Sequence, residues 1–241
     1  MSENLIEFIQ LPLNGFVDNF PFPPPISAQE TAPSWYKAQP SSFSKDGEDR
    51  NKNLTIKKCL PIFDAMTMGY LLLMPVDLYI NTKNEEIEWH ISEEFSHIKD
   101  ILISWHSSEQ VSHYPSKSNI YTNNLLRIMP MWMTKTPEGY STLFTSPIHQ
   151  SNIPIKAVEA VIDTDKFLPV SRNVFFLEKG FEGVIKQGTP IAQVIPFKRE
   201  SWRMSLAVDH NAEQVIDQRN RKNPFFPNGY RNIAWEKKNF S

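Results

Sequence analysis

Cysteine is almost absent from this chain of 241 residues, in which Cys59 is the single example. An intramolecular disulfide is therefore excluded, and we expect a protein of the reducing cytoplasm. No apolar run approaches the length of about 18 residues that a membrane helix needs. No charged-then-apolar leader begins the sequence either, so we expect a soluble chain that has no signal peptide and does not use a membrane.

A surplus of charge of one sign is also lacking. The chain has 25 basic and 27 acidic side chains and a net charge of −2, which gives no overall attraction to nucleic acid. Glycine is scarce, with 8 residues against 19 prolines, and this ratio predicts stiff connections and few long helices. Phosphate-binding glycine loops and nucleophile elbows do not occur, so no sequence motif alone identifies an enzyme.

The chain does contain many short runs of β-branched and aromatic residues, separated by glycine and proline. Such runs are typical of strands, and Gly180 and Gly183 are expected to form turns between them. The sequence therefore predicts a mainly β protein with strands over residues 54–62, 68–80, 87–91, 101–105, 125–133 (broken at Pro130), 161–163, 173–177 and 191–197.

Three segments are expected along the chain. Residues 1–53 form an N-terminal arm and a mobile loop, with one edge strand near residues 6–11 and a proline-rich stretch over 21–25. Residues 54–206 form a single β domain with an insertion at about 84–118, and Asp64 is expected in a turn. Residues 207–241 form a helix, capped by Asp209 or Asn211, and a tail.

Four segments resemble, in the same order, the superfamily of dUTP pyrophosphatases (dUTPases) and dCTP deaminases. They are DAMTMGYLLLMPVDL (64–78), TPEGYSTLFTSPIHQ (136–150), VIDTD (161–165) and GTPIAQVI (188–195). The resemblance implies a dUTPase-like (β-clip) β-barrel or sandwich that forms trimers, with Asp163 at the position of the carboxylate that orients the attacking water. The whole chain also resembles a family of bacterial and bacteriophage proteins of uncharacterised function, which shares the signature GTPIAQVIPFKRE. This resemblance implies the cytoplasm of a bacterium or of a phage-infected cell.

The phosphate-binding features of the superfamily are missing. Its Arg-Ser-Gly loop is replaced by Ser-Pro-Ile-His at 146–149, which removes a guanidinium suited to phosphate. Because triphosphate hydrolysis requires charge neutralisation at several oxygens, we expect hydrolysis to be lost and a small polar ligand or nucleotide to be bound instead. The expected ligand-binding residues are Asp64, Tyr140, Asp165, Gln193, Lys198 and Arg199.

Two other classes of function stay open. In the first, His106, His149 and Asp163 are catalytic residues that act around a divalent metal or as acid and base, with His106 and His149 as the metal ligands. In the second, the protein is a bacterial or phage structural or assembly protein whose apolar and proline-rich arms drive homo-oligomerisation. The segment 198–203 is basic and aromatic, and Trp202 is expected to pack against the domain.

Overall fold

The computed structural model describes residues 5–10, 22–44, 52–84, 87–111, 113, 120–150, 152–167, 173–208, 211–214, 216 and 229–241. The protein is mainly β, as the sequence predicts, with 38% strand and 19% helix. The chain divides into two compact units, and we describe each by itself. The first contains residues 1–33 and 66–199, and the second contains residues 34–65 and 200–241.

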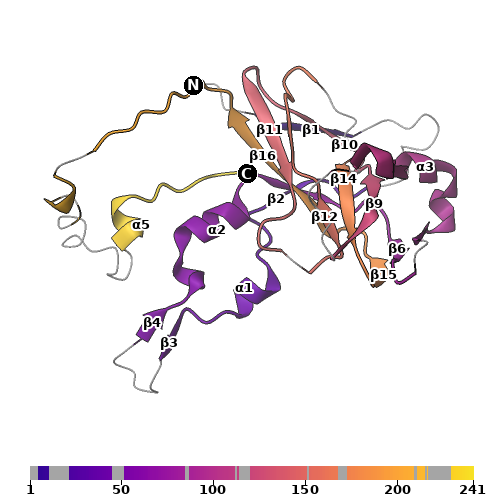
Figure 1. Cartoon of the computed structure of the whole chain (residues 1–241), viewed down its shortest axis with the longest axis horizontal. Coiled ribbons are helices and arrows are strands. Elements are labelled where there is room, and N and C mark those ends of the chain that lie inside the picture. Colours follow the sequence, from indigo (N-terminus) through magenta and orange to yellow (C-terminus); the bar gives the residue numbers. More distant parts are fainter. Residues whose placement is uncertain are drawn as a thin grey trace. The chain divides into compact units, whose positions relative to one another are not determined.

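The first unit consists mostly of antiparallel strands (Figure 1). Its helical elements are η3 (Glu93–Ile98), α3 (Lys99–Leu102) and η4 (Ser108–Val111). Its strands are β1 (Glu7–Gln10), β2 (Ile26–Ser27), β5 (Tyr70–Leu73), β6 (Leu78–Asn81), β7 (Glu88–Ile91), β8 (Ile103–His106), β9 (Tyr121–Ile128), β10 (Trp132–Lys135), β11 (Tyr140–Thr145), β12 (Ile155–Ala157), β13 (Ala160–Ile162), β14 (Asn173–Glu178), β15 (Glu182–Ile185) and β16 (Pro190–Lys198).

The strands of the first unit form open sheets. A five-stranded sheet has the order β13-β11-β16-β5-β2, a four-stranded sheet β12-β14-β9-β8, and a three-stranded sheet β15-β6-β7, while β1 pairs with β10. Among the described strands no closed barrel is formed, so the barrel form of the expected fold is not observed there.

Several predicted strands are confirmed, and the differences have local causes. The run over 68–80 is two strands, β5 and β6, because Pro75 lies between them and cannot donate to a ladder. The run over 125–133 is likewise broken at Pro130, as expected, between β9 and β10. Gly180 adopts a φ of 75° in a turn, whereas Gly183 lies within β15 and the expected turn there is wrong.

One prediction based on an apolar run is wrong, and another is confirmed only in part. The expected strand over 54–62 is mostly helical, because Thr55 caps a short helix by accepting a hydrogen bond from the Lys57 amide. Asp64 consequently lies in a helix and not in a turn. The strand expected over 101–105 begins only at Ile103, since α3 continues to Leu102.

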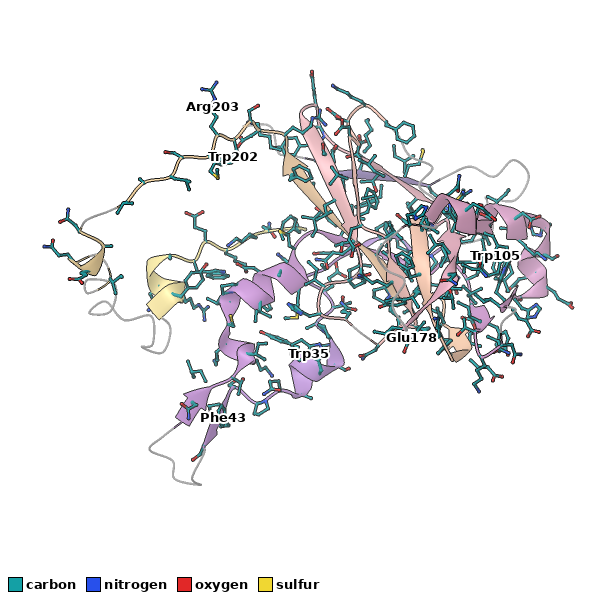
Figure 2. All side chains as sticks on the ribbon, in the orientation of Figure 1. Trp35, Phe43, Trp105, Glu178, Trp202 and Arg203 are labelled. Carbon is teal, nitrogen blue, oxygen red and sulfur yellow. The ribbon has the colours of Figure 1, made fainter. Side chains whose placement is uncertain are left out.

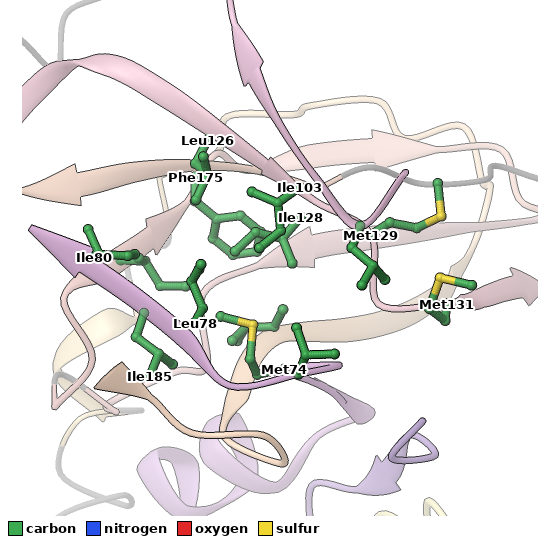
Figure 3. Packing of buried hydrophobic residues seen from close by; sticks show 14 of the residues in the cluster. Met74, Leu78, Ile80, Ile103, Leu126, Ile128, Met129, Met131, Phe175 and Ile185 are labelled. Carbon is green, nitrogen blue, oxygen red and sulfur yellow. The ribbon is translucent and has the colours of Figure 1, made fainter. Parts of the chain in front are cut away.

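The main core is shared by the four-stranded and three-stranded sheets, each of which presents one apolar face (Figure 3). Side chains alternate between the faces of a strand, so Leu126 and Ile128 of β9 both enter the core. Phe175 of β14 is fully buried beside them. The other sheet contributes Leu78, Ile80 and Ile185.

The second unit is richer in helices than the first. Its elements are α1 (Ser34–Ala38), β3 (Ser42–Ser44), β4 (Lys52–Leu54), η2 (Ile56–Lys58), most of α2 (Leu60–Thr67) and α5 (Gly229–Ile233). Helical residues at 212–214 and 216 fall within the predicted C-terminal helix, of which the rest lies outside the described residues. None of the described helices is long and apolar enough to cross a membrane.

The packing predicted for Trp202 is wrong. This side chain is 86% exposed, although it lies only four residues after the end of β16 at Lys198. The proline-rich stretch is described only from Phe22 onwards, where Phe22 is buried and Trp132 donates from its indole nitrogen to the Pro23 carbonyl at 2.9 Å.

Gly69 provides a direct test of how closely β16 approaches the turn before β5. Its φ is 75°, and a Cβ atom would lie 2.1 Å from the Val194 carbonyl oxygen. We therefore expect Gly69→Ala to lower the free energy of unfolding by more than about 3 kcal/mol. Gly188→Ala is the matched control, because its φ is 80° with nothing within 4 Å of the added atom. It should cost only about 1–2 kcal/mol. Urea denaturation measures both, and equal losses would contradict the close approach.

Candidate functional site

Three strand ends lie together along one side of the five-stranded sheet, where β13 and β16 end and β11 begins. We call this side the site edge. Strands β13 and β16 both run antiparallel to β11, so their carboxyl ends lie beside the amino end of β11. The residues that follow β13 and β16 are therefore brought to the start of β11. In the sequence these residues include Asp163, Asp165 and Arg199. The strand pairing, and not any local motif, places them together.

Asp165 and Arg199 form the central ion pair of this edge. The Arg199 Nη1 donates to Asp165 Oδ1 at 2.9 Å, and Nη2 pairs with the other carboxylate oxygen. The Gly139 amide also donates to Asp165 Oδ2 at 2.8 Å. The Asp165 side chain is only 2% exposed. Its hydrogen bonds from Arg199 hold the pKa of Asp165 well below the usual range, and the same contact raises the pKa of Arg199.

Asp163 is held beside this pair but is open to solvent. Its Oδ1 accepts a hydrogen bond from the Ser141 hydroxyl at 2.6 Å and lies 3.3 Å from Arg199 Nη1, while its side chain is 54% exposed. Arg199 Nη1 also donates to the Tyr140 carbonyl at 2.7 Å and to the Ser141 hydroxyl at 3.1 Å. The Arg199 guanidinium therefore donates to oxygen atoms of the protein. The charged group of the cluster that is most exposed is the Asp163 carboxylate.

A buried threonine network supports the turn that carries the two aspartates. The hydroxyl of Thr164 lies 2.7 Å from that of Thr136 and 2.8 Å from that of Thr142. Thr164 and Thr142 are fully buried, and the Phe167 amide donates to the Asp163 carbonyl at 2.9 Å. Because each hydroxyl can donate and accept, the network fixes the backbone between Asp163 and Asp165.

Two partly exposed phenylalanines belong to the segments that carry the cluster. Phe197 lies directly opposite Ser141 in the β11–β16 register, so the two side chains share a face of the sheet. Phe197 is 39% exposed and Phe167, at the end of the turn, is 63% exposed. Tyr140 and Lys198 also pair with each other at this edge, but their side chains leave from the opposite face because adjacent residues alternate. Tyr140 contributes its backbone to the cluster, because its carbonyl accepts a hydrogen bond from Arg199 Nη1.

Gln193 and His149 lie at the other end of β11. Thr145 is paired with Gln193, whereas Tyr140 is paired with Lys198, so about 17 Å of strand separates the two ends. Gln193 is fully buried, donates to the Met68 carbonyl at 2.6 Å and accepts from the Ile148 amide at 2.8 Å. Its amide therefore ties two loops to β16. The neighbouring His149 adopts a φ of 59° in one of those loops.

His106 lies on a different sheet, at the edge strand β8. Its Nδ1 accepts a hydrogen bond from Arg127 Nε at 2.9 Å. Burial and the charge of Arg127 lower the pKa of His106. A neighbouring guanidinium repels a metal cation, and within the described ranges no group of three or more His, Cys, Asp or Glu side chains is placed to hold a metal ion. The structure does not gather His106, His149 and Asp163 into one such group.

Asp64 belongs to the second unit and has its own partners there. Its carboxylate accepts from the Trp235 indole nitrogen at 2.9 Å and from Lys238 Nζ at 2.9 Å. These contacts anchor the C-terminal tail to α2. The predicted site residues that the structure brings together are thus Asp163, Asp165 and Arg199, with Tyr140 contributing its carbonyl.

Sequence reasoning missed the serine and the threonines of this edge. Ser141 and Thr142 are adjacent on β11 and point to opposite faces. Two polar residues within a strand of this sheet are the sequence signal that could have indicated them. Comparisons with protein-family models, curated proteins and solved structures gave no match. The site is therefore interpreted from its own geometry.

The ion pair between Asp165 and Arg199 makes the stability of the fold sensitive to acid. Because the pKa of Asp165 is depressed in the folded state, its contribution is complete above the unfolded pKa of about 3.9 and is lost as the pH falls below that value. We expect Asp165→Asn to lower Tm at pH 7, with a gap to wild type that narrows towards about pH 2. Asp163→Asn, at a half-exposed position, should lower Tm less. Calorimetry measures Tm at each pH. A Tm difference between wild type and Asp165→Asn that does not change with pH would show that the ionisation of Asp165 is not its cause.

Proposed function

We propose that the protein binds a small uncharged polar ligand, of the nucleoside or sugar class, at the cluster of Asp163, Ser141, Asp165 and Arg199, and that it does not hydrolyse triphosphates. The observation that supports this most directly is the pairing of Arg199 with the buried Asp165, which leaves Asp163 half-exposed as a fixed hydrogen-bond acceptor. A fixed acceptor suits a ligand that carries hydroxyl or amino donors.

The charge of the cluster favours a donor over a phosphate. The groups in direct contact are two carboxylates and one guanidinium, which sum to a negative charge, and Lys166 adds a positive charge near Asp165. All the described bonds of Arg199 Nη1 go to protein oxygens, namely those of Tyr140, Ser141 and Asp165. A phosphate would have to displace these acceptors and approach two carboxylates, which is electrostatically unfavourable. Loss of triphosphate hydrolysis on a dUTPase-like scaffold is consistent with this balance.

The apolar flank supports a ligand with a ring. Phe197 shares a face with Ser141, and Phe167 is joined to Asp163 by a backbone hydrogen bond. Small-molecule sites combine apolar or aromatic surface with a few fixed polar groups, and an exposed aromatic ring can stack on a base or on the apolar face of a sugar. The resemblance of residues 161–165 to the dUTPase hairpin makes deoxynucleosides the first ligands to test.

The metal-dependent alternative receives less support. His106 is bonded to Arg127 on one sheet, and His149 lies beyond the opposite end of β11 from Asp163. Acid–base chemistry requires groups within hydrogen-bond reach of one substrate atom. These three side chains do not offer that arrangement, whereas Asp163 and Ser141 are already in contact.

The test is a thermal-shift titration with deoxynucleosides and with their triphosphates. A nucleoside at a hundredfold its dissociation constant should stabilise the wild type by about 2.7 kcal/mol, or roughly 5–10 °C in Tm for a chain of this size. Asp163→Ala should abolish the shift, because it removes the acceptor, while changing the ligand-free Tm little. Asp77→Ala is the matched control, since Asp77 is a carboxylate of similar exposure (45%) that pairs with Lys186 elsewhere.

Three results would overturn the proposal. One is an equal nucleoside shift in wild type and Asp163→Ala, which would place the ligand elsewhere. The other is a shift with triphosphates alone, which would mean that phosphate recognition carries the binding. Absence of a shift with nucleosides and with simple sugars at millimolar concentration would also count against it.

A further inference from the structure

The segment 200–208, here called the exposed arm, follows β16 as extended chain without secondary structure. Every residue in it is exposed, and four of its side chains are large and apolar: Trp202 (86% exposed), Met204 (87%), Leu206 (86%) and Val208 (81%). Figure 2 labels Trp202 and Arg203 on this stretch. Single exposed apolar residues are ordinary, but four in nine residues form a contiguous patch of the kind that marks an interaction site.

The spacing of the apolar side chains indicates how the exposed arm is used. They occupy every second position. Ser201 precedes them, and Arg203, Ser205 and Ala207 lie between them. In a strand, alternate side chains point to opposite faces, so this segment would present one apolar face and one face of polar or small residues. That pattern fits a strand whose apolar side is covered by a sheet and whose backbone pairs with an open edge.

An open edge with matching character exists on the same chain. The five-stranded sheet ends at β13, whose outer side is paired with no described strand. Its three residues are all apolar, and Val161 is 60% exposed while Ala160 is exposed as well. The other sheet-edge strands are more buried or carry polar side chains, as in β12, β8, β7 and β15. An exposed apolar edge is where strand addition is expected.

We propose that the exposed arm of one protomer adds as a strand to β13 of a second copy of this chain. Each protomer then both supplies an arm and accepts one, which is the arrangement of an exchanged homo-oligomer. The proposal rests on the arm and the edge alone, and it does not depend on ligand binding at Asp163.

The area involved is sufficient for a stable interface. Trp202 would bury about 200 Å² and the three smaller side chains about 100 Å² each, or roughly 500 Å² per arm. The covered edge has only the three residues of β13 and loses a smaller area, so two exchanged arms remove somewhat more than about 1,000 Å² from water, above the minimum of about 1,000 Å² for a specific interface. Specific interfaces bury about 1,200–2,000 Å². One arm alone, bound to an unrelated protein, would bury only about half of this area, which favours reciprocal exchange between copies.

The first experiment measures the mass of the full chain by light scattering and native mass spectrometry at roughly 50 µM, above the micromolar dissociation constant of the weakest interfaces of this size. We expect a multiple of 27.9 kDa. The variant Trp202→Ser/Met204→Ser/Leu206→Ser should weaken association at least about 100-fold. The control Ser201→Asn/Ser205→Asn/Ala207→Ser changes the other face to the same extent and should keep the wild-type mass. Circular dichroism confirms that each variant is folded.

A second experiment identifies the acceptor strand. In a Cys59→Ser background, Leu206→Cys and Val161→Cys are made as separate variants, mixed, and treated with a flexible bismaleimide. We expect a covalent dimer from the mixture and much less from a mixture of Leu206→Cys with Val184→Cys, which tests the edge strand β15.

Several outcomes would overturn the proposal. A monomeric wild type at this concentration would do so, as would an oligomer that survives the triple substitution. A Leu206→Cys/Val161→Cys double variant that links within one chain and gives no dimer would show that the exposed arm folds back on its own protomer. A wild type that is monomeric but binds lipid vesicles through the exposed arm would assign the apolar face to a membrane instead.

Discussion

The bidentate pair between Asp165 and Arg199 is the contact on which the candidate site depends. Arg199 follows the longest strand of the five-stranded sheet, and Asp165 lies in the turn after an edge strand of the same sheet. Because the two are joined, the turn is fixed to the strand end that it faces. Asp163, two residues earlier, is held in place by the same turn while remaining half-exposed. Removal of the Arg199 side chain would leave the Asp165 carboxylate buried without its cation, which would lower the stability of the fold.

The pair also determines which chemistry the edge can support. In a phosphate site the guanidinium faces the ligand, whereas here it faces protein oxygens. The exposed functional group is the Asp163 carboxylate, which accepts a hydrogen bond from the Ser141 hydroxyl. This orientation of the guanidinium supports the proposed binding of uncharged donors. A resemblance of four segments to a hydrolase superfamily need not imply the reaction of that superfamily.

The sequence predicts the class of fold better than its connections. Strands such as β14 and β16 follow from continuous β-branched runs, and the break at Pro130 follows from a missing amide donor. The segment over 54–62 is apolar enough for a strand, but the cap at Thr55 and the adjacent helical turns favour a helix. A local hydrogen bond of this kind outweighs periodicity, and the composition of the segment does not reveal it.

The candidate site was predictable in part, for a similar reason. Asp163, Asp165 and Arg199 could be singled out as polar residues at strand ends, but their pairing depends on the register of β11 with two other strands. Gln193 illustrates the limit: its type suggests ligand binding, and its position shows a buried amide bonded to two loops. The packing predicted for Trp202 failed because basic and aromatic composition does not specify whether a chain segment has a sheet to lie against.

The long-range origin of the site has a consequence for folding. The hydrogen bonds that build it join residues 22, 34 and 58 positions apart in sequence. Contacts of this separation require loop closure before they contribute, so they form with the sheet and not before it. A chain in which β11, β13 and β16 have paired in another register would have its strands but not the site. Recognition at Asp163 would therefore distinguish the correctly folded protein from misfolded forms of similar secondary structure.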